Sequence, residues 1–216
     1  MRPAPPDHAG DPVSEASNWN LPNALTTLRL LLVPVFLWLL LRDGGDDTGS
    51  RVAAAAVFAV ASATDLLDGE IARRRGLVTT FGKLADPIAD KALTGAALIG
   101  LSALGDLPWW VTVVILGREI GVTVLRFVVI RHGVIPASRG GKTKTVLQMV
   151  AILLYLLPLT GVLASLRWWV MAAALVATVV TGVDYVRKAY VMREGSERTQ
   201  AKRAARAAAR ASRGSS

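Results

Sequence analysis

The chain has 216 residues, of which 52% are hydrophobic, and its formal net charge is +9. Its mean hydropathy of +0.43 is typical of a membrane protein rather than of a water-soluble domain. The sequence contains no cysteine, which excludes disulfides, thiolate nucleophiles and thiolate metal sites.

Six apolar stretches are long enough to cross a bilayer, because a spanning helix needs about 20 apolar residues. We therefore predict an all-α, integral membrane bundle of six transmembrane helices at 24–41, 51–68, 84–104, 108–130, 145–164 and 168–186. Residues 1–18 are polar and lack the apolar core of a signal peptide, so we expect the first helix to stay in the mature protein. We divide the chain into a polar tail at 1–18, a membrane domain at 19–190 and a basic Ala/Arg-rich tail at 191–216.

Basic residues are unevenly distributed between the two sets of helix ends. One set holds Arg73, Arg74, Arg75, Lys83, Arg131, Arg139, Lys142, Lys144 and the basic tail, and the other holds only Arg42, Arg51 and Arg167. Cytoplasmic loops carry the excess of lysine and arginine. We therefore expect a multi-pass protein of the cell membrane with both termini in the cytoplasm.

The basic tail carries Arg203, Arg206, Arg210 and Arg213, which would form one cationic stripe on a helix. Anionic lipid headgroups are the expected partner, at about 1 kcal/mol per charge near the surface. Nucleic acid is disfavoured because no aromatic residue interleaves the tail, and a plain solvated tail is the remaining alternative.

The first predicted helix opens with LPNALTTLR, in which Asn23, Thr26 and Arg29 recur every third residue. This spacing places the three side chains on one helix face. Helix capping explains Asn23 but not the deeper Arg29.

Four aspartates lie within 26 residues where the second predicted helix ends and the third begins. Asp65 and Asp68 are spaced i, i+3, and Asp86 and Asp90 are spaced i, i+4, so each pair shares a helix face. A short basic link predicts an antiparallel hairpin whose carboxylates converge at a cytoplasm-facing polar site. Divalent cations relieve the repulsion between such carboxylates, and oxygen ligands favour Mg²⁺, Mn²⁺ or Ca²⁺ over zinc.

The residues around these aspartates suit a phosphate ester. Gly69, Ala72 and Gly82 are small and leave room beside the backbone, and Arg73 can bind a phosphate. We therefore predict metal-assisted chemistry on a phosphate ester. The alternative is a hairpin whose aspartates cap helices and pair with nearby cations, which does not explain an i, i+4 pair facing the membrane.

Two further groups of charged residues lie near the predicted helices. Arg118 and Glu119 lie inside the fourth, where Glu119 shares a face with Arg126 and Arg118 points elsewhere. Lys142 and Lys144 open the fifth, in ASRGGKTKTVLQM. These groups predict an anion pocket; an internal Arg–Glu pair and topology-marking lysines are the alternatives.

The motif D-x2-D-G-x2-A-R-x8-G-x3-D-x3-D resembles the signature of the CDP-alcohol phosphatidyltransferase family without a mismatch; its members are Asp65, Asp68, Gly69, Ala72, Arg73, Gly82, Asp86 and Asp90. The resemblance covers about residues 19–190. The segments LPNALTTLR, GREIGVTVLR and GKTKTVLQM are similar to those of family members that use sn-glycerol 3-phosphate.

The resemblance implies a transferase of phospholipid biosynthesis that moves the phosphatidyl group of CDP-diacylglycerol to sn-glycerol 3-phosphate and releases CMP. It implies two Mg²⁺ or Mn²⁺ ions, the first at Asp65, Asp68 and Asp86, the second at Asp65, Asp86 and Asp90, with Asp90 as general base. It also implies a homodimer and a CDP site made by Gly69, Ala72, Arg73, Thr79 and Gly82, beside Asn23, Thr26 and Arg29.

Lys142, Lys144 and Arg118 are our candidates for binding the acceptor phosphate. Inositol phosphate or phosphatidylglycerol as acceptor is the first alternative; the sparse polar lining of the expected pocket favours the smaller glycerol phosphate over inositol phosphate. The alternative from another class is a cation-coupled transporter. It is disfavoured because the aspartates crowd at one mouth and form no acidic path across the bilayer.

Overall fold

The computed structural model describes the backbone of residues 21–75, 80–129 and 139–214. Side chains are described for residues 24–64, for 88–126 without Asp90, and for 141–192 without Lys142. In this part of the chain all regular structure is helical. The elements are α1 (Leu21–Leu41), a short 3₁₀ helix η1 (Arg42–Gly45), α2 (Thr48–Arg75), α3 (Thr80–Ala103), α4 (Trp109–Val129), α5 (Arg139–Leu156) and α6 (Gly161–Gly214).

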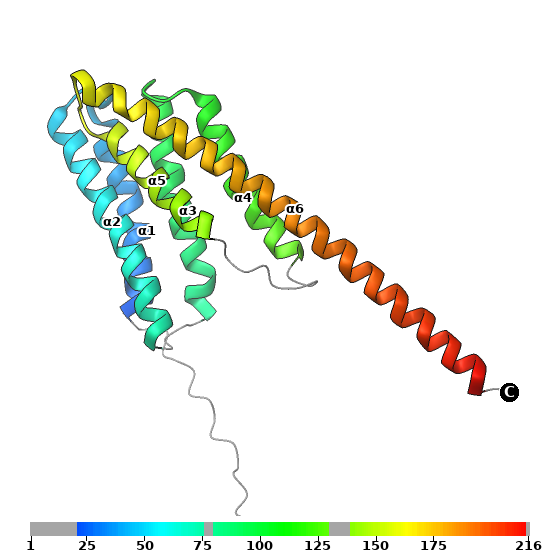
Figure 1. The fold of residues 1–216 in the computed structure, drawn as a ribbon. Helices are drawn as coiled ribbons and strands as arrows, with labels where there is room; N and C mark the ends of the chain where they lie inside the picture. The colour runs from blue at the N-terminus through cyan, green and yellow to red at the C-terminus, as the bar shows by residue number, and fades with distance from the viewer. Residues whose placement is uncertain (1–20, 76–79, 130–138, 215–216) are drawn as a thin grey trace, which may run out of the picture.

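Consecutive helices run in opposite directions and form one bundle (Figure 1). α1 packs against both α2 and α3, α5 packs against α6 and α2, and α4 packs against α6 and α3. The carboxyl end of α2 and the amino ends of α1 and α3 therefore lie at one end of the bundle, which we call the motif end. The α1–α2, α3–α4 and α5–α6 connections lie at the opposite end, which we call the turn end.

Each predicted apolar range corresponds to one helix, but the boundary between the last two ranges is wrong. We expected a helix at 145–164, whereas α5 ends at Leu156 and α6 begins at Gly161. Pro158 explains the break, because proline has no amide hydrogen and disfavours helical conformation in the residue before it. Gly161 has a φ of +61°, a left-handed conformation that glycine adopts without steric cost. α6 then continues as a helix through the basic tail to Gly214.

Small residues allow the first three helices to pack closely. Phe58 of α2 is buried, as are Ala54, Ala55 and Ala61 of the same helix, and it contacts Phe36 of α1 with ring centroids 5.9 Å apart. A Cβ atom on Gly100 of α3 would lie only 2.7 Å from Cδ2 of Leu40 in α1. Small residues at such contacts are typical of helix bundles in lipid, where close backbone approach supplies the packing energy.

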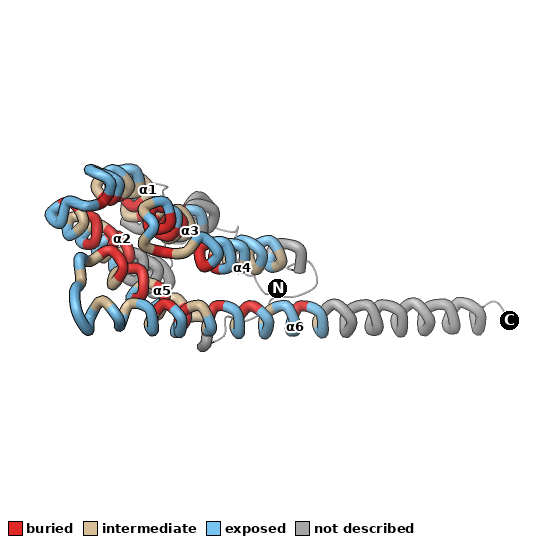
Figure 2. The backbone as a smooth tube through the Cα atoms, turned by 90° about the horizontal axis from the view of Figure 1, so that it is seen from above, coloured by how far each residue is buried: buried red, intermediate tan, exposed pale blue. Residues whose placement is uncertain are grey.

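The outer surface of the bundle is apolar, and Figure 2 shows the buried residues confined to the inner faces of the helices. Every one of the six helices exposes large hydrophobic side chains, among them Leu31, Val60, Ile99, Val113, Val150 and Val180. Two stretches, Ala24–Gly45 and Gly161–Met192, are long and apolar enough to cross a membrane. Exposed apolar surface on every helix suits lipid and not water, and the chain is a membrane protein.

Candidate functional site

The acidic motif is divided between two helices that meet at the motif end. Asp65 and Asp68 lie in α2, and Asp86 and Asp90 lie in α3, so the predicted spacing of each pair along a helix is present in the backbone. The two helices run in opposite directions, as the predicted hairpin requires (Figure 1). The side chains of the motif, from Asp65 through Asp90, lie outside the described residues, as does Thr79.

α1 brings two candidate nucleotide-binding residues into the bundle near the motif end. Thr26 is 1% exposed and Arg29 is 2% exposed, so the helix face that they share is buried. The side chain of Asn23, the third member of this face, lies outside the described residues. Burying an arginine inside a membrane bundle costs free energy, so Arg29 is a candidate for a role in helix packing or in function.

A cavity of about 320 Å³ lies between α3, α4 and α5. Its polar lining comes from all three helices: Lys91, Thr94, Glu119, Lys144, Thr145 and Gln148. Its apolar lining includes Ala96, Ile99, Leu116, Ile120, Met149 and Ile152. Lys91 directly follows Asp90 in the sequence, so the polar part of the cavity begins where the acidic motif ends.

Glu119 organises the charges at this cavity. Its Oε1 accepts a close hydrogen bond from Nζ of Lys144 in α5 and a second one, of 3.0 Å, from Nη1 of Arg118. Arg118 in turn donates from Nη2 to Oγ1 of Thr181 in α6 at 2.9 Å. Lys144 is only 5% exposed, so its ammonium group depends on such partners. The carboxylate of Glu119 thus pairs with two cations and joins α4 to α5, and Arg118 extends this network to α6.

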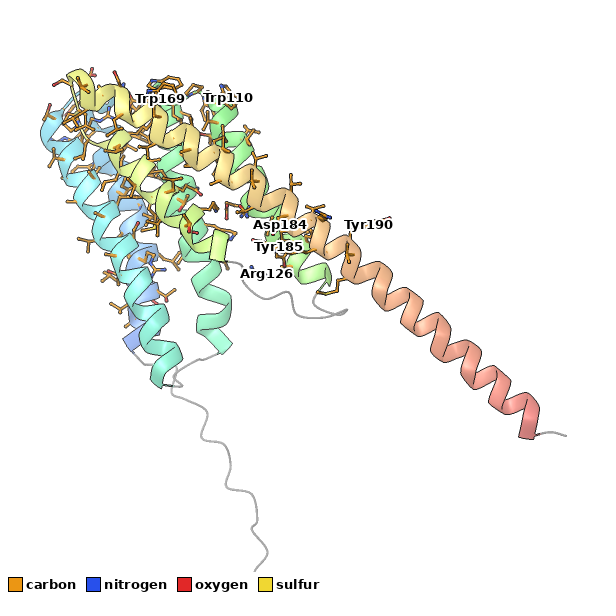
Figure 3. All side chains as sticks on the ribbon, viewed as in Figure 1. Trp110, Arg126, Trp169, Asp184, Tyr185 and Tyr190 are labelled. Carbon is orange, nitrogen blue, oxygen red and sulfur yellow. The ribbon has the colours of Figure 1, made fainter. Side chains whose placement is uncertain are left out.

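The structure brings some of the predicted anion-binding residues together and separates others. Lys144 lines the cavity, whereas Arg118 does not and instead extends toward α6. The side chain of Lys142 lies outside the described residues. Glu119 pairs with Arg118 and not with Arg126, whose guanidinium carbon lies 5.9 Å from the ring centroid of Tyr185 (Figure 3).

Sequence reasoning overlooked Lys91 as a residue of the cavity. Lys91, Gly95 and Ile99 follow one another at intervals of four residues, and all three line the cavity. This spacing in the sequence indicates that the three residues share one face of α3, because residues four apart lie on the same side of a helix.

The fold and the site define a class: a helical membrane protein with an acidic motif at one end and a cation-lined cavity beside it. Residues 19–180 match the family model described as CDP-alcohol phosphatidyltransferase, which covers most of the chain. The chain belongs to the CDP-alcohol phosphatidyltransferase family, and the predicted resemblance is confirmed.

Three relatives within the family are named for particular activities. The chain is 62% identical over 170 residues to the probable phosphatidylglycerophosphate synthase of Mycobacterium tuberculosis (strain H37Rv), which covers 79% of this chain and 81% of the relative. It is 41% identical over 186 residues to the CDP-diacylglycerol–glycerol-3-phosphate 3-phosphatidyltransferase of Bacillus subtilis (strain 168), covering 79% and 95%. It is 39% identical over 139 residues to a CMP-forming cardiolipin synthase of Streptomyces coelicolor, covering 63% and 65%.

Proposed function

We propose that this protein is an enzyme of phospholipid biosynthesis that transfers the phosphatidyl group of CDP-diacylglycerol to sn-glycerol 3-phosphate. The products are phosphatidylglycerophosphate and CMP. The observation that carries the proposal is the complete acidic motif on α2 and α3, with a cavity lined by Lys91 and Lys144 next to it. The relatives from Mycobacterium tuberculosis and Bacillus subtilis, which are named for this activity, support the choice of acceptor.

The four aspartates of the motif, Asp65, Asp68, Asp86 and Asp90, are proposed to hold two Mg²⁺ or Mn²⁺ ions. Their donor atoms are all carboxylate oxygens, which are the ligands that these hard cations prefer. The helical spacing of each pair allows both carboxylates to face the same point. When bound, the ions would neutralise the diphosphate and the departing CMP oxygen.

The protein groups around the diphosphate are proposed to position it and to move one proton. Asp90 takes the proton from the acceptor hydroxyl as that oxygen attacks the phosphorus joined to diacylglycerol, and the bond from this phosphorus to the CMP oxygen breaks. Direct displacement is favoured because the chain contains no cysteine nucleophile; an aspartate nucleophile is the alternative. The CDP group would lie against Gly69, Ala72, Arg73, Thr79 and Gly82, with Asn23, Thr26 and Arg29 beside the nucleotide.

The cavity between α3, α4 and α5 is proposed to receive the acceptor. Lys144 would bind its phosphate, together with Lys142 two residues earlier in α5, while Arg118 contributes through its hydrogen bond to Glu119. Only a few neutral polar groups line the cavity: Thr94, Thr145 and Gln148. Inositol phosphate would need partners for several more hydroxyl groups, and a desolvated hydroxyl without a partner is costly. Glycerol 3-phosphate is therefore the better fit.

Phosphatidylglycerol is the second candidate acceptor. The apolar lining of the cavity, including Ile99, Ile120 and Ile152, is suited to a lipid, and Ile99 and Ile120 are exposed at the surface of the bundle. The cardiolipin synthase from Streptomyces coelicolor is a relative whose name matches such a reaction. The two buried or half-buried cations at Glu119 favour the more highly charged acceptor, glycerol 3-phosphate.

All six helices are proposed to cross the membrane, with the motif end and both termini in the cytoplasm. The apolar outer surface supports this arrangement. Exposed tryptophans support it too, because Trp110 and Trp169 both lie at the turn end (Figure 3), where aromatic residues would mark the far interface. We further propose that the protein is a homodimer and that its basic tail contacts anionic lipid headgroups, as its charge favours.

An acceptor panel tests the proposal directly. The purified protein is incubated with CDP-diacylglycerol, Mg²⁺ or Mn²⁺, and one acceptor: glycerol 3-phosphate, inositol phosphate or phosphatidylglycerol. CMP release and the lipid product are then measured. We expect CMP release to depend on glycerol 3-phosphate and the product to be phosphatidylglycerophosphate. Dependence on phosphatidylglycerol would instead assign cardiolipin synthesis, and no CMP release with any acceptor would refute the transferase assignment.

A further inference from the structure

We infer that Glu119 is a positioning residue for the acceptor site, and that Arg118 and Thr181 anchor it to α6. The inference rests on the proposed binding of the acceptor phosphate by Lys144. It gives Glu119 and Thr181 a role in that site and makes Arg118 the link between them; Arg118 and Thr181 lie outside the cavity lining. Their proposed effect is on the binding of the acceptor, with no direct part in the chemical step.

The first argument is the arrangement of hydrogen bonds. A lysine side chain is flexible, and ordering it costs rotamer entropy. Glu119 already holds the ammonium group of Lys144 at the cavity wall, so less entropy is lost when the acceptor binds. Arg118 bonds the same oxygen of Glu119 and thereby restrains the carboxylate.

The second argument is the anchoring of Arg118 on α6. Oγ1 of Thr181 accepts a hydrogen bond from Arg118 and itself donates to the carbonyl of Ala177 at 2.7 Å, which fixes the hydroxyl orientation. Gly182 leaves space for the arginine, since a Cβ atom there would lie 3.0 Å from Cγ of Arg118 and 3.3 Å from its Nε. Thr181 thus provides a hydrogen-bond acceptor for Arg118, and Gly182 provides the space for its side chain.

The third argument is charge. Among the side chains that the structure describes, the cavity and its adjoining ion pairs contain Lys91, Lys144 and Arg118 against the carboxylate of Glu119. The cations outnumber the carboxylate, which suits a phosphate dianion, and Lys142 would add a further positive charge. Without Glu119 the cations would repel one another in a partly buried site, and their positions would be less defined.

The test uses a matched pair of threonines on α6. Thr181→Val and Thr178→Val each remove a hydroxyl that bonds to the carbonyl four residues earlier, but only Thr181 also bonds Arg118. We expect Thr181→Val to raise the KM for glycerol 3-phosphate about 2- to 10-fold, which is less than the loss of a hydrogen bond to the phosphate itself because Thr181 acts only through Arg118 and Glu119. We expect kcat and the KM for CDP-diacylglycerol to stay unchanged, and Thr178→Val to resemble the wild type.

Variants of Glu119 and Lys144 complete the experiment. Glu119→Gln should raise the KM for glycerol 3-phosphate about 5- to 30-fold, and Glu119→Asp should restore part of the loss. Equal effects of the two threonine variants, or equal effects on both substrates, would overturn the positioning role. If Lys144→Ala leaves the acceptor KM unchanged, the proposed acceptor site itself is wrong. Should Glu119→Gln fail to fold, the threonine pair alone decides the question.

Discussion

Arg51 of α2 and Asp106 in the α3–α4 turn form an ion pair in which Nη2 and Oδ2 are 2.6 Å apart. The same guanidinium donates to the carbonyls of Tyr155 at 2.9 Å and Leu156 at 3.3 Å, at the end of α5, and to that of Gly45 at 3.3 Å. Carbonyls at a helix end have no partner within the helix, and here the side chain of Arg51 supplies donors to two of them. One arginine therefore joins four segments at the turn end of the bundle.

Replacing Arg51 should destabilise the bundle and leave the catalytic rate unchanged. We expect Arg51→Ala to lower the free energy of unfolding by about 1–3 kcal/mol, because Asp106 and the α5 carbonyls lose their donor. Thermal unfolding in detergent measures the loss, and kcat at low temperature should be unchanged. Arg42→Ala is the control, since Arg42 and its partner Asp43 have side chains that are 52% and 66% exposed and their pair should contribute little. Equal destabilisation by both variants would contradict the proposed role of Arg51.

Asp90→Asn should nearly abolish turnover while the protein stays folded. The amide keeps the volume of the side chain but cannot accept the proton, and loss of a general base typically costs about 10²–10⁴ in rate. CMP release under saturating substrates measures kcat, and the melting temperature in detergent checks the fold. A kcat close to that of the wild type would remove Asp90 from the proposed mechanism.

Chelation of divalent cations should abolish activity reversibly. Carboxylates bind Mg²⁺ and Mn²⁺ through oxygen alone, so EDTA should remove these ions and either metal should restore CMP release. The titration of activity with each metal gives its apparent affinity. Full activity in a preparation freed of metal, verified by elemental analysis, would rule out the proposed metal site.

The local pattern of the sequence predicted the features that depend on spacing along one helix. The spacing of the acidic motif and the shared face of Thr26 and Arg29 follow from a helical period, and the apolar ranges locate six helices. That this face is buried is known only from the structure. The features that it missed depend on contacts between helices. No periodicity within α4 indicates that Glu119 binds Lys144 of α5, because that contact requires the packing of two segments far apart in the sequence. Pro158 predicts the helix break after Leu156, whereas the apolar stretch continues past it, so hydropathy alone does not show the break.

Lys142→Ala and Lys144→Ala should weaken the binding of the acceptor much more than that of the lipid nucleotide. Each lysine is proposed to contact only the acceptor phosphate, and a charge-assisted hydrogen bond contributes about 1.5–3 kcal/mol. The KM for glycerol 3-phosphate should therefore rise at least about tenfold, while that for CDP-diacylglycerol changes little. Equal increases for both substrates would show that the lysines serve the nucleotide site instead.

Asp47 provides a prediction about pH at the turn end, where it precedes α2. Its Oδ2 accepts a hydrogen bond of 2.8 Å from the backbone N–H of Ser50, as a helix-capping residue does. Hydrogen bonds from the side chain and the backbone of Ser50 lower the pKa of Asp47 below its ordinary value. A carboxyl group whose pKa is lower in the folded state stabilises the protein above its unfolded pKa, and this contribution is lost as the pH falls through the folded pKa.

Asp47→Asn should therefore remove a pH-dependent contribution and keep the cap, because asparagine also caps helices but does not titrate. We expect the wild type to melt at a higher temperature than Asp47→Asn at about pH 7, and the difference to shrink toward about pH 3. Ser50→Ala is the companion variant: it removes one donor to the carboxylate, so the pH dependence should weaken but not vanish. A difference in melting temperature between wild type and Asp47→Asn that stays constant across this pH range would show that the capping interaction does not depend on the charge of Asp47.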